Sequence, residues 1–115
     1  MILDRRGHPI THKTVWRIYQ AQAPDGRAYI GCTTRPVVER WQAHLTQSLC
    51  AWANGPLHTA IRDYGRGAFR VTILTEALSA QEAGEKEARY IRDRNTLEPH
   101  GLNIKRHGLR GAKMR

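Results

Sequence analysis

The chain has 115 residues, enough for one domain with a modest core, and its 40% hydrophobic and 25% charged content is ordinary for a globular protein. Nineteen Lys and Arg against ten Asp and Glu give a formal net charge of +9, which favours a polyanionic partner, most commonly nucleic acid. No apolar run reaches the ~18 residues of a membrane-spanning helix, and the charged first residues contain no apolar signal core. We therefore expect a cytoplasmic protein without a membrane partner.

The two cysteines, Cys32 and Cys50, do not have CxxC spacing, which argues against a zinc site or a disulfide framework. His8 and His12 are four residues apart, but a proline between them argues against a helix that would bring them together. We see no internal repeat and no low-complexity linker. The sequence predicts an N-terminal arm over residues 1–13, one domain over 14–104 and a basic tail over 105–115.

Residues 17–34 have the pattern of a β-hairpin around the turn Pro24-Asp25-Gly26. A three-residue loop closed by a left-handed glycine would pair Ala23 with Arg27. This register makes Tyr19 and Tyr29 diagonal neighbours on one face, opposite the apolar face. A two-residue Asp-Gly turn would instead place the tyrosines on opposite faces. Two phenols on one face can pack under a helix or serve chemistry, and the hairpin alone leaves both open.

Residues 33–49 are expected to form a helix with Thr34 or Arg35 as its cap and Pro36 in its first turn. Arg40 and His44 are one helical turn apart beside the apolar stripe, so both side chains can reach one point. The predicted apolar stripe consists of Val37, Val38, Trp41, Leu45 and Leu49.

Residues 54–65 predict a second, short helix that begins near Asn54, has Pro56 in its first turn and stops at Gly65. Its predicted inward residues are Leu57, Ala60, Ile61 and Tyr64. Alternation of Phe69, Val71 and Ile73 then predicts a third strand. A mixed or antiparallel sheet covered by helices follows from this order of elements.

A capping box, Ser79 with Glu82, predicts the start of a helix that ends near Arg94, with Leu78 and Ala83 as a hydrophobic staple. Its inward stripe is expected to contain Ala83, Tyr90 and Ile91. Glu87 falls on that same stripe, where a carboxylate is costly without a partner. A salt bridge to Arg or Lys and a bound metal ion are the two interpretations.

Five short motifs follow one another along residues 15–104. They are Tyr19 with Tyr29-Ile30-Gly31; Arg40-Trp41-x-x-His44; Asn54-x-x-Leu57-x-x-Ala60-Ile61-x-x-Tyr64-Gly65; Glu87-x-x-Tyr90-Ile91; and Gly101-x-Asn103. In this order, and on these expected elements, they resemble the GIY-YIG nuclease superfamily. The chain departs from the family at Arg17, which stands where the first motif has glycine. We expect this change to be tolerated and to crowd the strand edge or add a phosphate contact.

The resemblance implies an α/β (α+β) domain with a central three-stranded antiparallel sheet flanked by helices. It also implies hydrolysis of DNA phosphodiesters with one Mg²⁺ or Mn²⁺. Transferred by position, the implied catalytic residues are Tyr19, Tyr29, Arg40, His44, Glu87 and Asn103. Glu87 would be the metal's one protein ligand, which suits Mg²⁺ because that ion retains water and binds phosphate oxygens. No DxD, DxE or ExK pattern supplies the carboxylates of a two-metal site.

In this interpretation Tyr19 takes the proton of the attacking water and His44 relays it. A phenol titrates near about 10, so the pKa of Tyr19 would have to be lowered by Arg40 and the metal. Arg40 would bind the scissile phosphate through its planar fork. Tyr29 would donate a hydrogen bond to that phosphate or to the water, and Asn103 would hold the geometry of the site.

For DNA binding we expect basic residues outside the catalytic set: Arg17, Arg27, Arg35, Lys105, Arg106 and Arg110. The expected protein is a stand-alone nuclease, monomeric or homodimeric, guided by DNA shape or by a protein partner, as in homing, phage or structure-specific enzymes. The alternatives are a nucleic-acid-binding protein without catalysis, a nuclease-fold subunit of a larger complex, and a basic RNA-associated protein. An inactive descendant would have no need for Glu87 on an apolar stripe or for both phenols.

Overall fold

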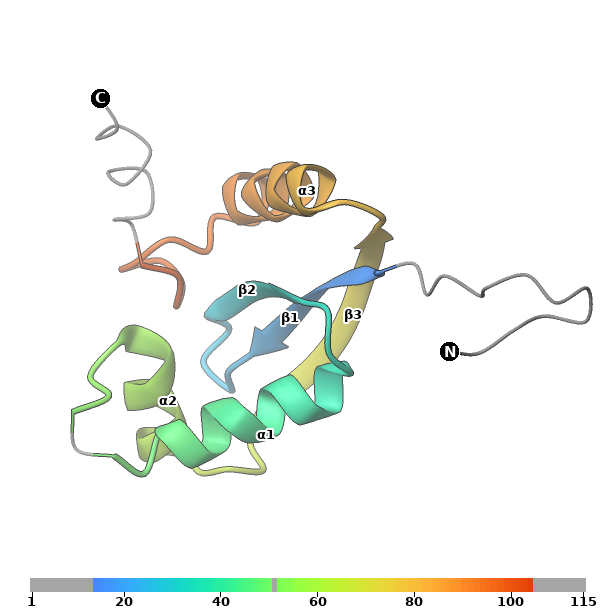
Figure 1. Cartoon of the computed structure of the whole chain (residues 1–115). Helices are drawn as coiled ribbons and strands as arrows, with labels where there is room; N and C mark the ends of the chain where they lie inside the picture. The colour runs from blue at the N-terminus through green and yellow to red at the C-terminus, as the bar shows by residue number, and fades with distance from the viewer. Residues whose placement is uncertain (1–13, 51, 105–115) are drawn as a thin grey trace, which may run out of the picture.

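The computed structural model describes residues 14–50 and 52–104. The elements in chain order are β1 (Trp16–Gln22), β2 (Ala28–Thr33), α1 (Val37–Gln47), α2 (Pro56–Tyr64), β3 (Arg70–Ala77) and α3 (Ala80–Asp93). The strands form one antiparallel sheet in the order β2-β1-β3. Figure 1 shows α3 on one side of the sheet and α1 with α2 on the other. The predicted fold class, a three-stranded antiparallel sheet flanked by helices, is confirmed. The predicted arm and tail lie outside the described residues.

The β1-β2 hairpin has the predicted three-residue loop. Gly26 has a positive φ of 94°, and the backbone N–H of Ala23 donates to the carbonyl of Arg27 at 2.8 Å. Glycine adopts this conformation without the steric cost of a Cβ atom. Tyr19 then pairs with Gly31, and Ala21 with Tyr29. The two tyrosines are therefore diagonal neighbours on one face, as predicted.

The sheet has a hydrophobic cluster on each face. Ile18 and Ile30 pack against α3, together with Ala77, Ala83 and Ile91. On the other face, Ala21 packs against α1 and α2 in a cluster with Ala23, Trp41, Leu45, Leu57, Ala60, Ile61 and Leu102. The tyrosine face is thus also a buried face, which places both phenols in a low-dielectric environment.

The third strand contains an irregularity that the alternation pattern did not predict. Ile18 pairs with Thr75 whereas Tyr19 pairs with Ile73, so Leu74 is one extra residue in β3. The bulge puts Leu74 against the α3 cluster, while Val71 packs in the cluster of α1 and α2. The predicted third strand is present, but Ile73, the last residue of the alternation that predicted it, is 52% exposed.

Several predicted helix ends and stripe positions also need correction. Pro36, not Thr34 or Arg35, is the N-cap of α1. The second helix begins and stops where expected, with Gly55 as its N-cap, Pro56 in its first turn and Gly65 at its end. Four side chains predicted to face inward or to pack are instead exposed: Val38, Leu49, Tyr64 and Leu78. Tyr90 packs, partly buried, against the α3 cluster, as predicted. The buried residues of α1 include His44, which was expected beside the stripe.

The capping box of α3 is present. The Ser79 hydroxyl accepts the backbone N–H of Glu82 at 3.0 Å, and the Glu82 carboxylate accepts the N–H of Leu78 at 2.9 Å. The helix ends with Asn95 in the left-handed region at φ 54°. In the described part of the chain, no helix combines the length and apolar character needed to cross a bilayer.

Candidate active site

Tyr19 lies at the centre of the candidate site. Its ring is completely buried, and its hydroxyl is 3.0 Å from Nε2 of His44. The Tyr29 ring lies 6.2 Å away, measured between centroids. Burial raises the pKa of Tyr19 above its ordinary value, the neighbouring Tyr29 raises it further, and the charge and hydrogen bond of Arg40 act in the opposite direction.

Gly31 makes room for the Tyr19 ring. A Cβ atom at position 31 would lie 2.6 Å from the Tyr19 hydroxyl oxygen, because the two residues are directly paired across the strands. Any larger residue would therefore displace the phenol. The glycine of the Tyr29-Ile30-Gly31 motif has a steric function: it lets β2 approach the tyrosine of β1.

His44 is neutral over most of the pH range. Burial, followed by the positive charges of Arg40 and His58, lowers its pKa to about 3. A neutral imidazole has one donor nitrogen and one acceptor nitrogen. In the tautomer whose Nε2 accepts the Tyr19 hydroxyl, Nδ1 donates toward Nε2 of His58 at 3.4 Å. The site therefore contains a Tyr19-His44-His58 chain.

Sequence reasoning missed His58. This residue follows the buried Leu57 in α2, and its ring centroid lies 5.6 Å from that of His44. Its only signal in the sequence is a position beside the apolar stripe of a short helix, which is typical of many surface histidines. The contact arises from the packing of α1 against α2, which local patterns do not reveal.

Arg40 acts on the whole cluster. It lies one turn before His44 on α1, and its charge acts to lower the pKa of Tyr19, Tyr29, His44 and His58. A guanidinium next to buried phenols favours any negative charge that enters the site, such as a phosphate.

Glu87 brings a carboxylate from α3 to the same strand edge. It is partly buried and forms a hydrogen bond with the thiol of Cys32 on β2. Burial, then the charge of Glu87 and this hydrogen bond, raise the pKa of Cys32 to about 11. The charge of Glu87 also raises the pKa of Tyr29, although burial is the largest cause there. The carboxylate is therefore electrostatically coupled to the tyrosine cluster.

Asn103 lies behind the site and braces β2. Its Oδ1 accepts the backbone N–H of Ile30 at 2.8 Å and the Thr96 hydroxyl at 2.7 Å, and its Nδ2 donates to the Ile30 carbonyl at 2.9 Å. A Cβ atom at Gly101 would collide with the backbone of Thr96, so only glycine fits there. The Gly101-x-Asn103 motif holds the strand that carries Tyr29.

The donor set around Glu87 fits a hard divalent ion that takes one protein ligand. Among residues 14–50 and 52–104, no group of three or more His, Cys, Asp and Glu side chains could hold a metal. A closed structural metal centre is therefore not formed by these residues. Mg²⁺ retains several waters and is commonly bound by one or two carboxylates with substrate phosphates, and one carboxylate whose charge acts on Tyr29 suits that pattern.

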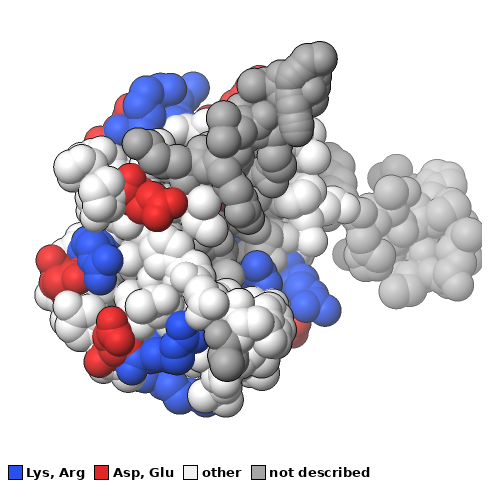
Figure 2. Space-filling model, turned by 90° about the vertical axis from the view of Figure 1, so that its left-hand side faces the viewer, with Lys and Arg blue, Asp and Glu red and all other residues white. Residues whose placement is uncertain are grey.

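The predicted DNA-contacting residues are dispersed. Arg17 is 3.7 Å from Glu76, and Arg27 forms a 2.7 Å ion pair with Asp25 at the hairpin turn. Arg35 is exposed just before α1. Figure 2 shows Lys and Arg in separate groups, most of them beside acidic side chains. Such surface ion pairs contribute little free energy, so they do not prevent these arginines from contacting phosphates. Lys105, Arg106 and Arg110 lie outside the described residues.

The structure thus brings five predicted site residues together at the edge of β2, with Asn103 behind them: Tyr19, Tyr29, Arg40, His44 and Glu87. The family model of the GIY-YIG catalytic domain matches residues 15–103. Among solved structures, the chain is similar to a mutant of the catalytic domain of intron endonuclease I-TevI, with 22% identity and a TM-score of 0.68. That match covers 78% of this chain and 93% of the other and concerns the fold. A search of curated proteins gave no match.

Proposed function

This chain belongs to the GIY-YIG superfamily, and from that premise we propose that it is a metal-dependent endonuclease that hydrolyses DNA phosphodiester bonds. The main support for this proposal is the buried hydrogen bond between Tyr19 and His44. Arg40 lies one helical turn before His44 on α1. Hydrolysis needs a proton acceptor for water and positive charge for the transition state. These three side chains supply both functions at one place.

Tyr19 and His44 act as a pair in this proposal. Because burial raises the pKa of Tyr19, a free tyrosinate is a minor species at neutral pH. The Tyr19 oxygen therefore takes the proton of water as its own hydroxyl proton passes to Nε2 of His44. The low pKa of His44 keeps that nitrogen unprotonated before the step, and because the same burial disfavours an imidazolium, the Nδ1 proton of His44 would pass on to Nε2 of His58. The burial of Tyr19 thus changes the sequence-based mechanism, in which cationic neighbours alone lower its pKa.

Arg40 binds the phosphate, and Tyr29 donates a hydrogen bond to it. Glu87 would hold one Mg²⁺ or Mn²⁺, which supplies Lewis-acid stabilisation of the phosphate charge when bound. Asn103 supports this arrangement by fixing the backbone of Ile30, the residue after Tyr29. The expected substrate is DNA, because a protein with a formal net charge of +9 is attracted to the negatively charged phosphodiester backbone.

The test is conversion of supercoiled plasmid to nicked and linear forms with Mg²⁺, Mn²⁺ or EDTA. Glu87→Gln keeps the size of the side chain and removes its charge, and it should reduce cutting at least about 100-fold. Glu85→Gln is the matched control, because Glu85 is exposed on the same helix. The ratio of nicked to linear product at increasing protein concentration distinguishes single-site action from dimeric action.

Wild-type protein that binds the plasmid but never cuts it with either metal would favour the alternative, a nucleic-acid-binding protein or a subunit of a larger complex. Cutting that persists in EDTA would contradict metal dependence. Cutting by Glu87→Gln at the wild-type rate would contradict the assignment of Glu87 as the metal ligand.

A further inference from the structure

A pocket of about 290 Å³ opens beside the candidate active site. Tyr29 and His44 belong to both, so the pocket is continuous with the place where the phosphate would bind. Its volume is at the lower end for small-molecule sites, which suits a flat ligand smaller than a drug. The catalytic roles proposed above use the hydroxyl of Tyr29 and leave its ring face available.

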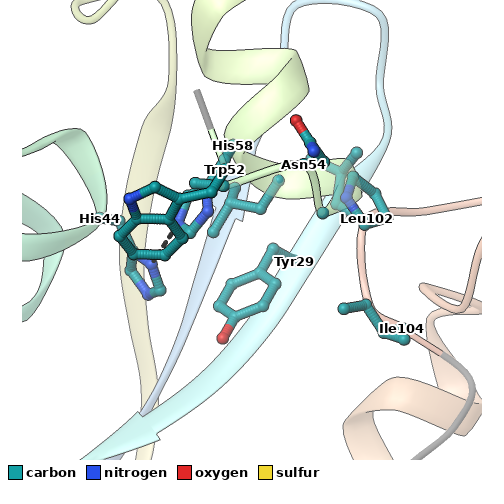
Figure 3. Close-up of a pocket in the computed structure, with 11 residues that line it drawn as sticks. Tyr29, His44, Trp52, Asn54, His58, Leu102 and Ile104 are labelled. Atoms are coloured by element: carbon teal, nitrogen blue, oxygen red, sulfur yellow. Dashed lines mark hydrogen bonds between the residues drawn. The ribbon is translucent and has the colours of Figure 1, made fainter. Parts of the chain in front are cut away.

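The walls of the pocket are mostly apolar and aromatic. Figure 3 shows the Tyr29 ring in the middle, with Trp52 on the side of the two histidines and with Leu102 and Ile104 across from it. Trp52 is 74% exposed, although tryptophan is among the side chains with most to gain from burial. An exposed indole at the mouth of an apolar pocket offers a stacking surface for a planar ligand.

The segment that carries Trp52 is tied to α2. The guanidinium Nη1 of Arg62 donates to the Ser48 carbonyl at 2.9 Å and to the Ala53 carbonyl at 2.8 Å. These bonds link the two ends of the connection between α1 and α2, because Ser48 follows the first helix and Ala53 precedes the second. The indole is thus presented by a braced connection, which lowers the ordering cost of binding a ligand.

Two polar side chains belong to the lining of the pocket. The amide of Asn54 and the imidazole of His58 line the pocket together with Trp52. The amide of Asn54 can donate and accept hydrogen bonds, and His58, whose Nε2 accepts from His44, still has its Nδ1–H as a donor, while the edge of a nucleobase presents both kinds of group. Apolar walls with a few convergent polar groups are typical of a site that orients a planar, polar-edged ligand.

We propose that this pocket receives one nucleobase of the DNA substrate, from the nucleotide next to the scissile phosphate. The base would stack on Trp52, and its edge would meet Asn54 and His58. A nucleobase satisfies three observations together: the aromatic wall, the polar edge groups and the continuity with the phosphate site. This inference rests on the proposed function, because the base belongs to the strand that is cut.

The pocket has a consequence for substrate choice. In duplex DNA the bases are stacked inside the helix, so one must leave the stack before it can enter. Unstacking costs least in single strands, mismatches and distorted duplexes. The protein should therefore prefer such substrates to a regular duplex, which gives it selectivity for DNA structure without a separate sequence-reading domain.

The experiment compares a short single-stranded oligonucleotide with an abasic oligonucleotide of the same backbone. Binding is measured by fluorescence anisotropy in EDTA, so that the readout is independent of cutting. Wild type should bind the oligonucleotide with bases about 5- to 150-fold more tightly, the range expected for stacking of one base. Trp52→Ala should lose most of this ratio while its affinity for the abasic backbone stays unchanged.

Leu49→Ala is the matched control, because Leu49 is 69% exposed nearby and does not line the pocket. The Leu49→Ala variant should retain the wild-type ratio of affinities. A loss of the ratio in this variant would overturn the assignment of base stacking to Trp52. An equal ratio in wild type and Trp52→Ala overturns the base pocket, even if wild type cuts plasmid. A ratio that depends on Trp52 in a protein that never cuts supports the pocket and overturns the proposed nuclease activity.

Discussion

The hydroxyl of Tyr19 and Nε2 of His44 are 3.0 Å apart inside the protein, joining the central strand to α1. Tyr19→Phe keeps the ring and removes the hydroxyl. It should lower the rate of plasmid nicking about 10²- to 10⁴-fold, as expected for loss of a general base, and destabilise the fold by about 1–3 kcal/mol because His44 loses a buried partner.

Nicking rates and urea unfolding would measure the two effects separately. Tyr64→Phe is the control, since it also removes a hydroxyl with a hydrogen bond, to Asp25 at 3.0 Å, but at an exposed position. If Tyr19→Phe nicks DNA as fast as wild type, Tyr19 is not the base.

The low pKa of His44 predicts an acid-sensitive fold. In the unfolded chain His44 takes up a proton near its ordinary value of about 6.5, whereas in the folded chain it does so only near 3. The unfolded state therefore binds more protons between these pH values, and stability falls as pH falls through this window. Between pH 7.5 and pH 5 the contribution of His44 is about 2 kcal/mol.

Urea unfolding of wild type and His44→Asn at both pH values would measure this contribution. It is the change in unfolding free energy between the two pH values in wild type, minus the same change in the variant. The variant should lose less stability on acidification than wild type does. His58 adds a smaller effect of the same sign in both proteins, because burial also lowers its pKa. Equal pH dependence in the two proteins would contradict the burial of a neutral His44.

Gly31→Ala should displace the Tyr19 ring, because the new Cβ atom would lie 2.6 Å from its hydroxyl oxygen. Forced repacking of this kind costs about 1–3 kcal/mol, and the nicking rate should fall with it, since the Tyr19 hydroxyl moves relative to His44. Gly67→Ala is the control, because a methyl group at that position would meet no atom within 4 Å. Thermal unfolding and plasmid nicking would give both quantities, and wild-type values for both would refute the close packing.

Asn103→Ala should destabilise the protein by about 2–4 kcal/mol, because the N–H and carbonyl of Ile30 and the Thr96 hydroxyl all lose a buried partner. Thr96→Val removes only one of these bonds and should cost about 1 kcal/mol. Chemical unfolding of both variants tests this order. The reverse order would argue that the amide of Asn103 is not a structural brace.

Much of the site could be predicted from the sequence because it depends on short-range constraints. The turn Pro24-Asp25-Gly26 sets the loop length, and the loop length determines that Tyr19 and Tyr29 share a face. Glu87 was identified because burying a carboxylate on an apolar stripe is costly. The structure places Glu87 beside Cys32, and its charge raises the pKa of Tyr29.

The features that were not predicted depend on how the helices and strands pack against one another. Periodicity assigns Val38 and Leu49 to the stripe of α1, but the sheet and α2 cover a narrower face that includes His44 instead. The extra residue Leu74 leaves no trace in a pattern of apolar residues. His58 becomes part of the site only through the packing of one helix on another.

The bracing of β2 by the segment around Asn103 also bears on self-association. β2 is at one edge of the sheet, and an open edge is a template for pairing with another chain. Here the N–H of Leu102 donates to the Ala28 carbonyl at 2.8 Å, and the Asn103 side chain occupies both backbone groups of Ile30. A second copy could not extend the sheet at this edge without displacing that segment. A dimer of this chain would therefore have to form through another surface.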